Sequence, residues 1–333
     1  MDSNLITGLT YILIGGTCSG IFAVPFNKKT GWKWENNWFV WSFAALLLAP
    51  WIVGAITVPQ LLPAITADPA CLLLVVVFGL IWGYGAILFG KGIDSLGVSL
   101  GQPIMLGLIN SVGTLMPIVL KDPAALLTPA GVKTVCGVAI ILVGIVLYSI
   151  AGGMKNKTSE KTAGPTTDRS FRKGLIICIL AGIFGPMINF AFVYGEPMQA
   201  YAVQAGTSPV NAANPIWCVA LTAGFIVNIV ACIRSFRRNG SWSIYKGNRL
   251  GIAFAALGGL LWYASIMLYG MGGNAIGEQG ASTGWAAMQS TAIIAGSLAG
   301  IVAGEWRNSS RRSLAIMLTG LLLLIAGVVT IAC

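Results

Sequence analysis

The chain has 333 residues, of which 56% are hydrophobic and only 9% are charged, and its formal net charge is +10. Water-soluble domains carry about 25% charged residues, so this composition disfavours a soluble enzyme, a nucleic-acid-binding protein and a secreted disulfide scaffold. Histidine is absent, which removes HExxH zinc sites and Ser–His or Cys–His catalytic pairs. We therefore expect a membrane protein that is not an enzyme and that uses no metal or cofactor.

Ten apolar stretches follow one another along the chain, each long enough to cross a bilayer as a helix of about 20 residues. Several contain glycine and proline, which membrane helices tolerate. In chain order the predicted spans are Leu5–Phe26, Trp38–Val58, Cys71–Gly90, Val98–Leu120, Val132–Ile150, Gly174–Tyr194, Pro209–Ile233, Leu250–Met271, Gly280–Gly304 and Leu314–Ala332.

The basic residues lie almost entirely in alternate loops between these spans. Of the 20 lysines and arginines, 18 fall in the loops after the first, third, fifth, seventh and ninth spans, and only Lys121 and Lys133 fall on the other side. Loops rich in lysine and arginine stay in the cytoplasm. We therefore expect a multi-pass protein of the cytoplasmic (inner) membrane with both termini on the outer side.

An internal duplication divides the chain. A shift of 180 residues aligns Gly79–Gly97 with Gly259–Gly277, and seven of the nineteen positions are identical, where chance predicts roughly two. The predicted units are a first five-helix repeat at 1–151, a cytoplasmic polar linker at 152–173 and a second five-helix repeat at 174–333. Because five is odd, the halves must insert in opposite orientations, as in many secondary transporters. The predicted fold class is an all-α polytopic membrane protein with ten transmembrane helices in two inverted repeats.

Polar and aromatic side chains within the spans are the predicted substrate site. Amides donate and accept hydrogen bonds, which suits sugar hydroxyls, and an indole can stack on the C–H face of a sugar. The alternative is that the amides bond neighbouring helices and the aromatic residues only pack. The candidates are Trp82, Trp262, Gln102, Asn110, Asn189, Asn211, Asn214, Gln289, Tyr263 and Trp285. A second tryptophan group around the second span is expected to form an interfacial belt: Trp32, Trp34, Trp38, Trp41 and Trp51.

The residue that couples transport to an ion is harder to place, because we expect no Asp or Glu deep in any span. The candidates for proton coupling are Glu278, Glu196 and Asp94, all in predicted turns. This shortage leaves sodium coupling or uniport open. Sodium can be held by backbone carbonyls at helix breaks, for example around Pro186.

Short segments spread over nearly the whole chain carry a family resemblance. They are AVPFNKK at 23–29, FGLIWG at 78–83, VGTLMP at 112–117, GGLLWY at 258–263 and EW at 305–306. In their order and spacing the chain resembles the L-rhamnose–proton symporter family, within the drug/metabolite transporter superfamily. The resemblance implies uptake of a neutral deoxy-sugar driven by the proton gradient, with the fifth and tenth spans outside the central cavity. Residues 280–284 are small and neutral where that family carries an aspartate and bulky aromatics, so a related sugar or polyol is also compatible.

Other functions stay open at this point. The runner-up is an exporter of amino acids, drugs or metabolites of the same superfamily, and sodium-coupled sugar uptake is a further alternative. The expected partners are a small neutral sugar, a coupling proton and membrane lipid, with no nucleic acid. The sequence gives no information on oligomeric state.

Overall fold

The computed structural model describes residues 3–27, 31–121, 123–163, 168–245, 248–277, 284–307 and 309–332, which contain helices and no strand. The α-helices are α1 (Ser3–Ile21), α2 (Trp34–Ser42), α3 (Ala49–Thr57), α4 (Leu61–Thr66), α5 (Pro69–Leu96), α6 (Val98–Lys121), α7 (Pro129–Ala163), α8 (Asp168–Phe184), α9 (Met187–Tyr194), α10 (Glu196–Gln204), α11 (Asn214–Asn239), α12 (Arg249–Ile276), α13 (Trp285–Val302) and α14 (Arg311–Ala332). Short segments of other helix types are η1 (Val24–Asn27), η2 (Phe43–Leu48), η3 (Pro123–Leu127), η4 (Pro209–Asn211) and η5 (Ser241–Tyr245).

Eight segments of the described chain are long and apolar enough to cross a bilayer. They coincide with eight of the ten predicted spans, so the protein is a polytopic, all-helical membrane protein. The other two predicted spans, Val98–Leu120 and Leu314–Ala332, fall on α6 and α14, which are helices of 24 and 22 residues. That these two helices also cross the membrane, giving ten crossings, stays a prediction.

The helices α5 and α12 have matching lengths and ends. Each contains 28 residues, and both bounds of α12 lie 180 residues after those of α5, since 249 − 69 and 276 − 96 are both 180. Side chains cap both starts: Asp68 accepts from two backbone amides of α5, and Asn248 accepts from one of α12. Both helices end at a glycine with positive φ, Gly97 at 81° and Gly277 at 85°, a conformation that favours glycine. These glycines are partners in the predicted duplication.

Three predicted spans are interrupted or begin later than expected. The second contains the π-helical segment η2 just before Pro50, whose missing N–H disturbs the α-helical hydrogen bonds. The sixth is broken at Gly185 and Pro186 into α8 and α9. The ninth is described as an α-helix from Trp285 onward, and residues 278–283 lie outside the described part of the chain.

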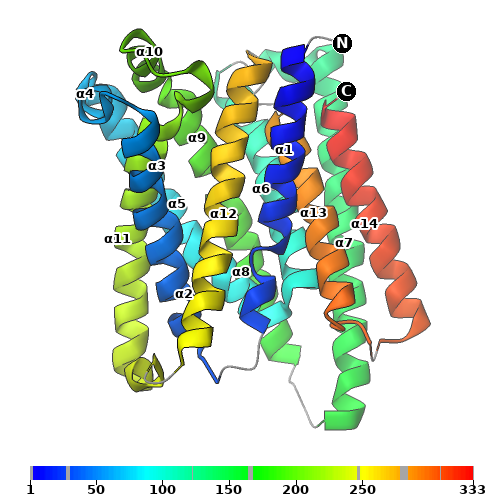
Figure 1. The fold of residues 1–333 in the computed structure, drawn as a ribbon. Coiled ribbons are helices and arrows are strands. Elements are labelled where there is room, and N and C mark those ends of the chain that lie inside the picture. The colour runs from blue at the N-terminus through cyan, green and yellow to red at the C-terminus, as the bar shows by residue number, and fades with distance from the viewer. Residues whose placement is uncertain are drawn as a thin grey trace.

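Figure 1 shows that the start of α1 and the end of α14 lie at the same end of the bundle, together with α4 and α10. We call this the terminal end. The opposite end, where α2 begins and α11 stops, holds Lys33, Lys91, Arg237 and Arg238, and we call it the basic end. Two chain ends on one side fit an even number of crossings.

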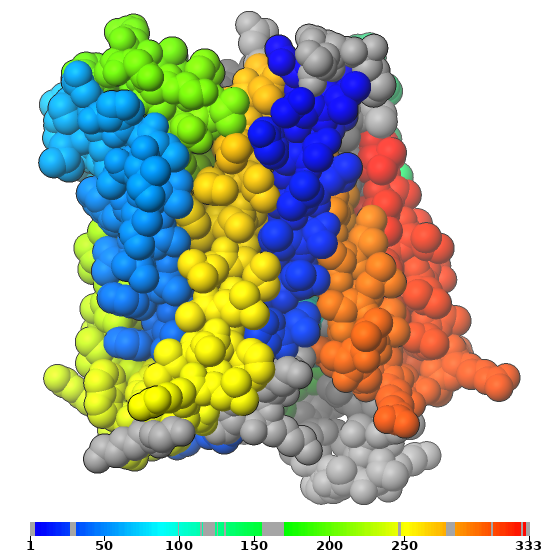
Figure 2. Space-filling view, viewed as in Figure 1, coloured from blue at the N-terminus to red at the C-terminus, as the bar shows by residue number. Residues whose placement is uncertain are grey.

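Helix contacts follow a regular pattern. α1 packs against α12 and α13, while α8 packs against α5 and α6. α11 lies along α5, and α2 with η2 lies along α12. α7 and α14 pack on each other at the side of the bundle, and Figure 2 shows α1 and α12 in continuous contact along the front face.

Glycines bring several of these helices into backbone contact. A β-carbon at Gly79 would lie 2.4 Å from the carbonyl oxygen of Ala220 on α11, and one at Gly16 would lie 2.6 Å from the carbonyl oxygen of Met288 on α13. Gly83 and Gly20 repeat these contacts one turn further along. This confirms that the two predicted GxxxG pairs serve close helix approach.

Candidate substrate cavity

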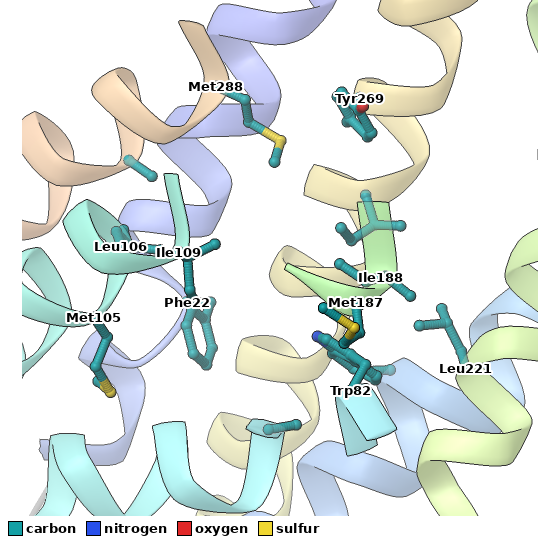
Figure 3. Packing of buried hydrophobic residues seen from close by; sticks show 14 of the residues in the cluster. Phe22, Trp82, Met105, Leu106, Ile109, Met187, Ile188, Leu221, Tyr269 and Met288 are labelled. Atoms are coloured by element: carbon teal, nitrogen blue, oxygen red, sulfur yellow. The ribbon is translucent and has the colours of Figure 1, made fainter. Parts of the chain in front are cut away.

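A cavity of about 580 Å³ lies among α1, α2, α5, α6, α9, α12 and α13, within the size range of small-molecule sites. None of the described residues of α7 or α14 lines it, which confirms that the fifth and tenth spans stand outside. Figure 3 shows Phe22, Ile109 and Met288 on one side of this region and Trp82 and Ile188 on the other. The lining residues are Ser19, Phe22, Trp38, Trp41, Trp82, Gly85, Ala86, Phe89, Leu106, Ile109, Gly185, Ile188, Trp262, Ser265, Ile266, Trp285, Met288 and Gln289.

The structure brings four of the ten predicted substrate residues together in this wall: Trp82, Trp262, Trp285 and Gln289. Trp82 and Trp262, which the duplication makes equivalent, stack on each other with ring centroids 5.2 Å apart and an interplanar angle of 24°. They come from α5 and α12, so the matched helices meet at the cavity through this pair. Offset stacking of this kind fixes both rings.

Two further tryptophans line the cavity that were expected in an interfacial belt. Trp38 and Trp41 on α2 are buried and stack with centroids 4.3 Å apart, and Trp41 contacts the edge of Trp262 at 5.3 Å. The belt interpretation is therefore wrong for these two residues. The spacing of Trp34, Trp38 and Trp41 by four and three positions places them on one helix face, and this signal could have identified them.

The cavity wall carries polar groups without protein partners. The indole N–H groups of Trp41 and Trp285 and the hydroxyl of Ser265 are buried and make no hydrogen bond within the described chain. Buried polar groups are almost always paired, and unpaired ones cost free energy. Three such groups around one uncharged cavity are therefore well placed to bond the hydroxyls of a neutral ligand.

Several predicted amides instead bond protein groups outside the cavity lining. The Gln102 amide donates to the carbonyls of Ser19 and Gly20, and so joins α6 to α1. Asn214 donates to Thr57, and Asn189 accepts from the Tyr269 hydroxyl at 2.6 Å.

Three candidates stand differently. Asn211 lies in η4 at the terminal end and is half-buried. Asn110 on α6 is fully buried, and both polar atoms of its amide lack a partner among the described residues. The Tyr263 hydroxyl is also buried and unpartnered. Asn110 and Tyr263 directly follow the cavity residues Ile109 and Trp262, so both lie within one residue of the wall, although neither lines it.

The carboxylates predicted for proton coupling do not meet at the cavity. Glu196 is the exposed first residue of α10 and lines a surface pocket at the terminal end. Asp94 is exposed near the end of α5 and lines a pocket at the basic end together with Glu305. Glu278 lies outside the described residues.

One carboxylate is buried in a membrane-spanning segment, against the expectation from the sequence. Glu35, in the first turn of α2, is only 3% exposed. Its Oε1 accepts hydrogen bonds from the Ser241 hydroxyl at 2.5 Å and from the Asn239 amide at 2.8 Å. Sequence reasoning missed it because its partners follow about 200 residues later. Its position in a run of tryptophans was the available signal.

With this geometry established, comparison with known proteins gives the family. The family model described as L-rhamnose-proton symport protein (RhaT) matches residues 1–332. The chain belongs to this family. It is similar to a curated protein of Enterobacter sp. (strain 638) named L-rhamnose-proton symporter, with 31% identity covering 98% of this chain and 96% of the relative. A protein of the same name from Cronobacter sakazakii is 30% identical, with 97% and 96% covered. The family is one of transporters, not of enzymes.

Proposed function

We propose that this protein imports a neutral monosaccharide, L-rhamnose or a related sugar, together with protons. The observation that carries the proposal is the uncharged cavity, in which the stacked Trp82 and Trp262 lie beside three buried polar groups without protein partners. The relatives named L-rhamnose-proton symporter support the substrate class and the coupling ion.

The cavity chemistry fits a sugar better than an ion. Its lining contains no Asp, Glu, Lys or Arg, so nothing there balances the charge of an ionic substrate, and charges are costly at such a site. Indole faces suit the C–H face and methyl group of a deoxy-sugar, and the free indole N–H groups and hydroxyl suit its oxygens.

Alternating access would come from two inverted five-helix repeats, 1–151 and 174–333. The helix contacts support this, because exchanging the halves maps them onto one another. α1 against α12 and α13 corresponds to α8 against α5 and α6, and α5 against α11 corresponds to α12 against α2. A two-fold relation also explains the reciprocal contact in which β-carbons at Gly144 and Gly320 would each lie 2.9 Å from the other's carbonyl oxygen. This architecture supports placement in the drug/metabolite transporter superfamily.

The orientation follows from the charge distribution. The basic end would face the cytoplasm because cytoplasmic loops retain lysine and arginine, and both termini would lie outside the inner membrane. Residues 152–173 would then form a cytoplasmic linker.

The coupling residue stays a proposal among Glu278, Glu196 and Asp94. The positions support entry and release better than binding at the cavity, because Glu196 lies at the terminal end and Asp94 at the basic end. The buried Glu35 is a fourth carboxyl at the basic end.

Counterflow in liposomes tests the proposal directly. Purified protein is loaded with unlabelled L-rhamnose, and uptake of labelled L-rhamnose is measured against a sugar panel with pH and sodium varied separately. We expect rhamnose or a close analogue to exchange, with net uptake driven by a proton gradient. Sodium-driven uptake would replace the coupling ion, and absence of exchange for every sugar combined with efflux of an amino acid or drug would overturn the proposal.

Variants of the cavity wall sharpen this test. Trp82→Ala and Trp262→Ala each remove one face of the stacked pair, so we expect the apparent affinity for the sugar to fall about three- to tenfold. Trp242→Ala is the matched control, because Trp242 is 59% exposed in η5 and does not line the cavity. Equal losses in all three variants would contradict a cavity role for the pair.

A further inference from the structure

A surface pocket at each end of the bundle approaches the central cavity. The basic-end pocket, about 1230 Å³, is lined by Phe26, Trp38, Asp94 and Glu305 among others. The terminal-end pocket, about 1200 Å³, is lined by residues that include Phe192 and Asn274. Trp38 lines both the basic-end pocket and the central cavity, so it forms the wall between them.

At the basic end, Trp38 is held against a glycine. A β-carbon at Gly90 on α5 would lie 2.6 Å from the Trp38 ring. The ring of Phe26 meets Trp38 edge-on with centroids 6.4 Å apart. Trp38 is only 2% exposed, so the aromatic layer leaves no open passage beside it.

At the terminal end, Trp217 takes the same position. A β-carbon at Gly270 on α12 would lie 2.9 Å from the Trp217 indole nitrogen. The Phe192 ring stacks on Trp217 at 5.5 Å and 8°. Phe192 also contacts Tyr269, which in turn contacts the cavity residue Trp285 at 5.3 Å. This aromatic layer therefore separates the cavity from the terminal-end pocket.

The two layers are related by the internal duplication. Gly90 and Gly270 are identical partners under the shift of 180. Trp217 follows Trp38 by 179 residues, and the contacts of α2 with α12 and of α11 with α5 use the same offset, since Gly259 faces the Trp41 carbonyl and Gly79 faces that of Ala220.

The phenylalanines obey the shift of their own helices. Phe192 follows Phe26 by 166 residues, which is also the separation of Gly16 and Gly182 in the first and sixth spans. Each layer therefore contains the same three elements: a tryptophan, the glycine against which it packs and a phenylalanine beside it.

We propose that Trp38 and Trp217 are the two gates of the carrier, closing the cavity at the basic end and at the terminal end. This inference rests on the proposed transport function. Movement of an indole away from its glycine opens the cavity to the pocket behind it, and the structure shows both gates closed. The gates position the substrate path, while the cavity residues bind the substrate.

The gates differ in how their indole nitrogens are held. Trp38 Nε1 donates to Asn228 Oδ1 at 2.7 Å, and the Asn228 amide donates to the carbonyls of Gly83 and Gly224. Trp217 Nε1 is buried without a hydrogen-bond partner in the described chain. The terminal-end gate therefore opens more readily than the basic-end gate.

Side-specific labelling of one cavity residue tests the proposal. Ser265 lines the cavity and is 1% exposed, so Ser265→Cys, in the full chain with its seven native cysteines replaced, reports access of a membrane-impermeant thiol reagent. The reagent is applied to vesicles from the face carrying the termini or from the other face. We expect Trp217→Ala to raise the rate from the terminal face about tenfold and Trp38→Ala to raise it from the basic face by a similar factor.

A conservative pair keeps the test decisive if an alanine variant fails to fold. Trp38→Phe removes a hydrogen bond, so labelling from the basic face rises about threefold. Trp217→Phe removes none, so labelling from the terminal face stays within a factor of two of the parent. Equal acceleration from both faces in either alanine variant, no acceleration, or the opposite sidedness would overturn the gates. Correct sidedness without sugar counterflow would reject only the proposed function, and counterflow without sidedness would reject only the gates.

Discussion

The basic and terminal ends of the bundle are packed alike but are held together differently. At the basic end, Glu35 accepts from Asn239 and Ser241, and Lys33 donates to the backbone carbonyl of Asn239. Asn36 adds a bond to the carbonyl of Ser241. All of these bonds join the start of α2 to the end of α11 and the segment after it.

The terminal end has fewer polar contacts between the corresponding helices. Asn214 at the start of α11 donates to Thr57 at the end of α3, and Asn274 donates to the Pro209 carbonyl. No carboxylate takes part in either bond. Backbone packing and small residues can be duplicated with the helices, whereas polar contacts depend on individual side chains that diverge. The difference indicates that the terminal end separates at lower cost.

The largest expected effect is at Glu35. Glu35→Ala leaves two buried donors without their charged acceptor, so we expect unfolding stability to fall by about 3 kcal/mol. Thr57→Val at the terminal end removes one neutral acceptor and should cost about 1 kcal/mol. Thermal denaturation of the purified protein in detergent compares the two variants. Equal losses would remove the stability difference between the ends.

A smaller effect is expected when a methyl group is placed under each gate tryptophan. Gly90→Ala and Gly270→Ala force the indole to shift, and overpacking of this kind costs about 1–3 kcal/mol. We expect Gly90→Ala to cost more, because its β-carbon meets ring carbons at 2.6 Å and the ring is fixed by Asn228.

The control for these two variants is Gly153→Ala on α7, where the nearest heavy atom would be 3.9 Å away. That change should be neutral or stabilise the helix by up to about 1 kcal/mol. The same denaturation assay ranks all three. A larger loss at Gly270 than at Gly90 would contradict the stronger hold on Trp38.

The sequence predicted the helices and part of the cavity because both leave local signals. Hydropathy gives the spans, and the identities around Trp82 and Trp262 placed two residues that meet in the cavity wall. The amides were ambiguous for a physical reason. The same side chain bonds a ligand or a neighbouring helix equally well, and only the fold shows that Gln102 bonds the backbone of α1.

Long-range contacts limited the rest. Trp38 and Trp41 lie near a lysine-rich loop, which is typical of interfacial residues, and their burial depends on α5 and α12. Glu35 looked like a surface charge because its donors belong to the chain beyond α11. Such pairings between distant segments produce no periodicity in the sequence.

The smallest expected effect concerns Tyr245, which donates from its hydroxyl to the Asn36 carbonyl at 2.9 Å and so adds to the contacts of the basic end. Burial raises the pKa of Tyr245 above its ordinary value, and the Glu35 carboxylate adds to this rise. A raised pKa in the folded state means that the contribution to stability is complete below the unfolded pKa of about 10 and is lost only as pH rises through the higher folded value. Tyr245→Phe should therefore cost about 1 kcal/mol, and the cost should be the same at pH 6 and pH 9. Denaturation of both proteins at these two pH values checks this, and a cost that shrinks toward pH 9 would show that the tyrosine ionises early and does not hold the basic end.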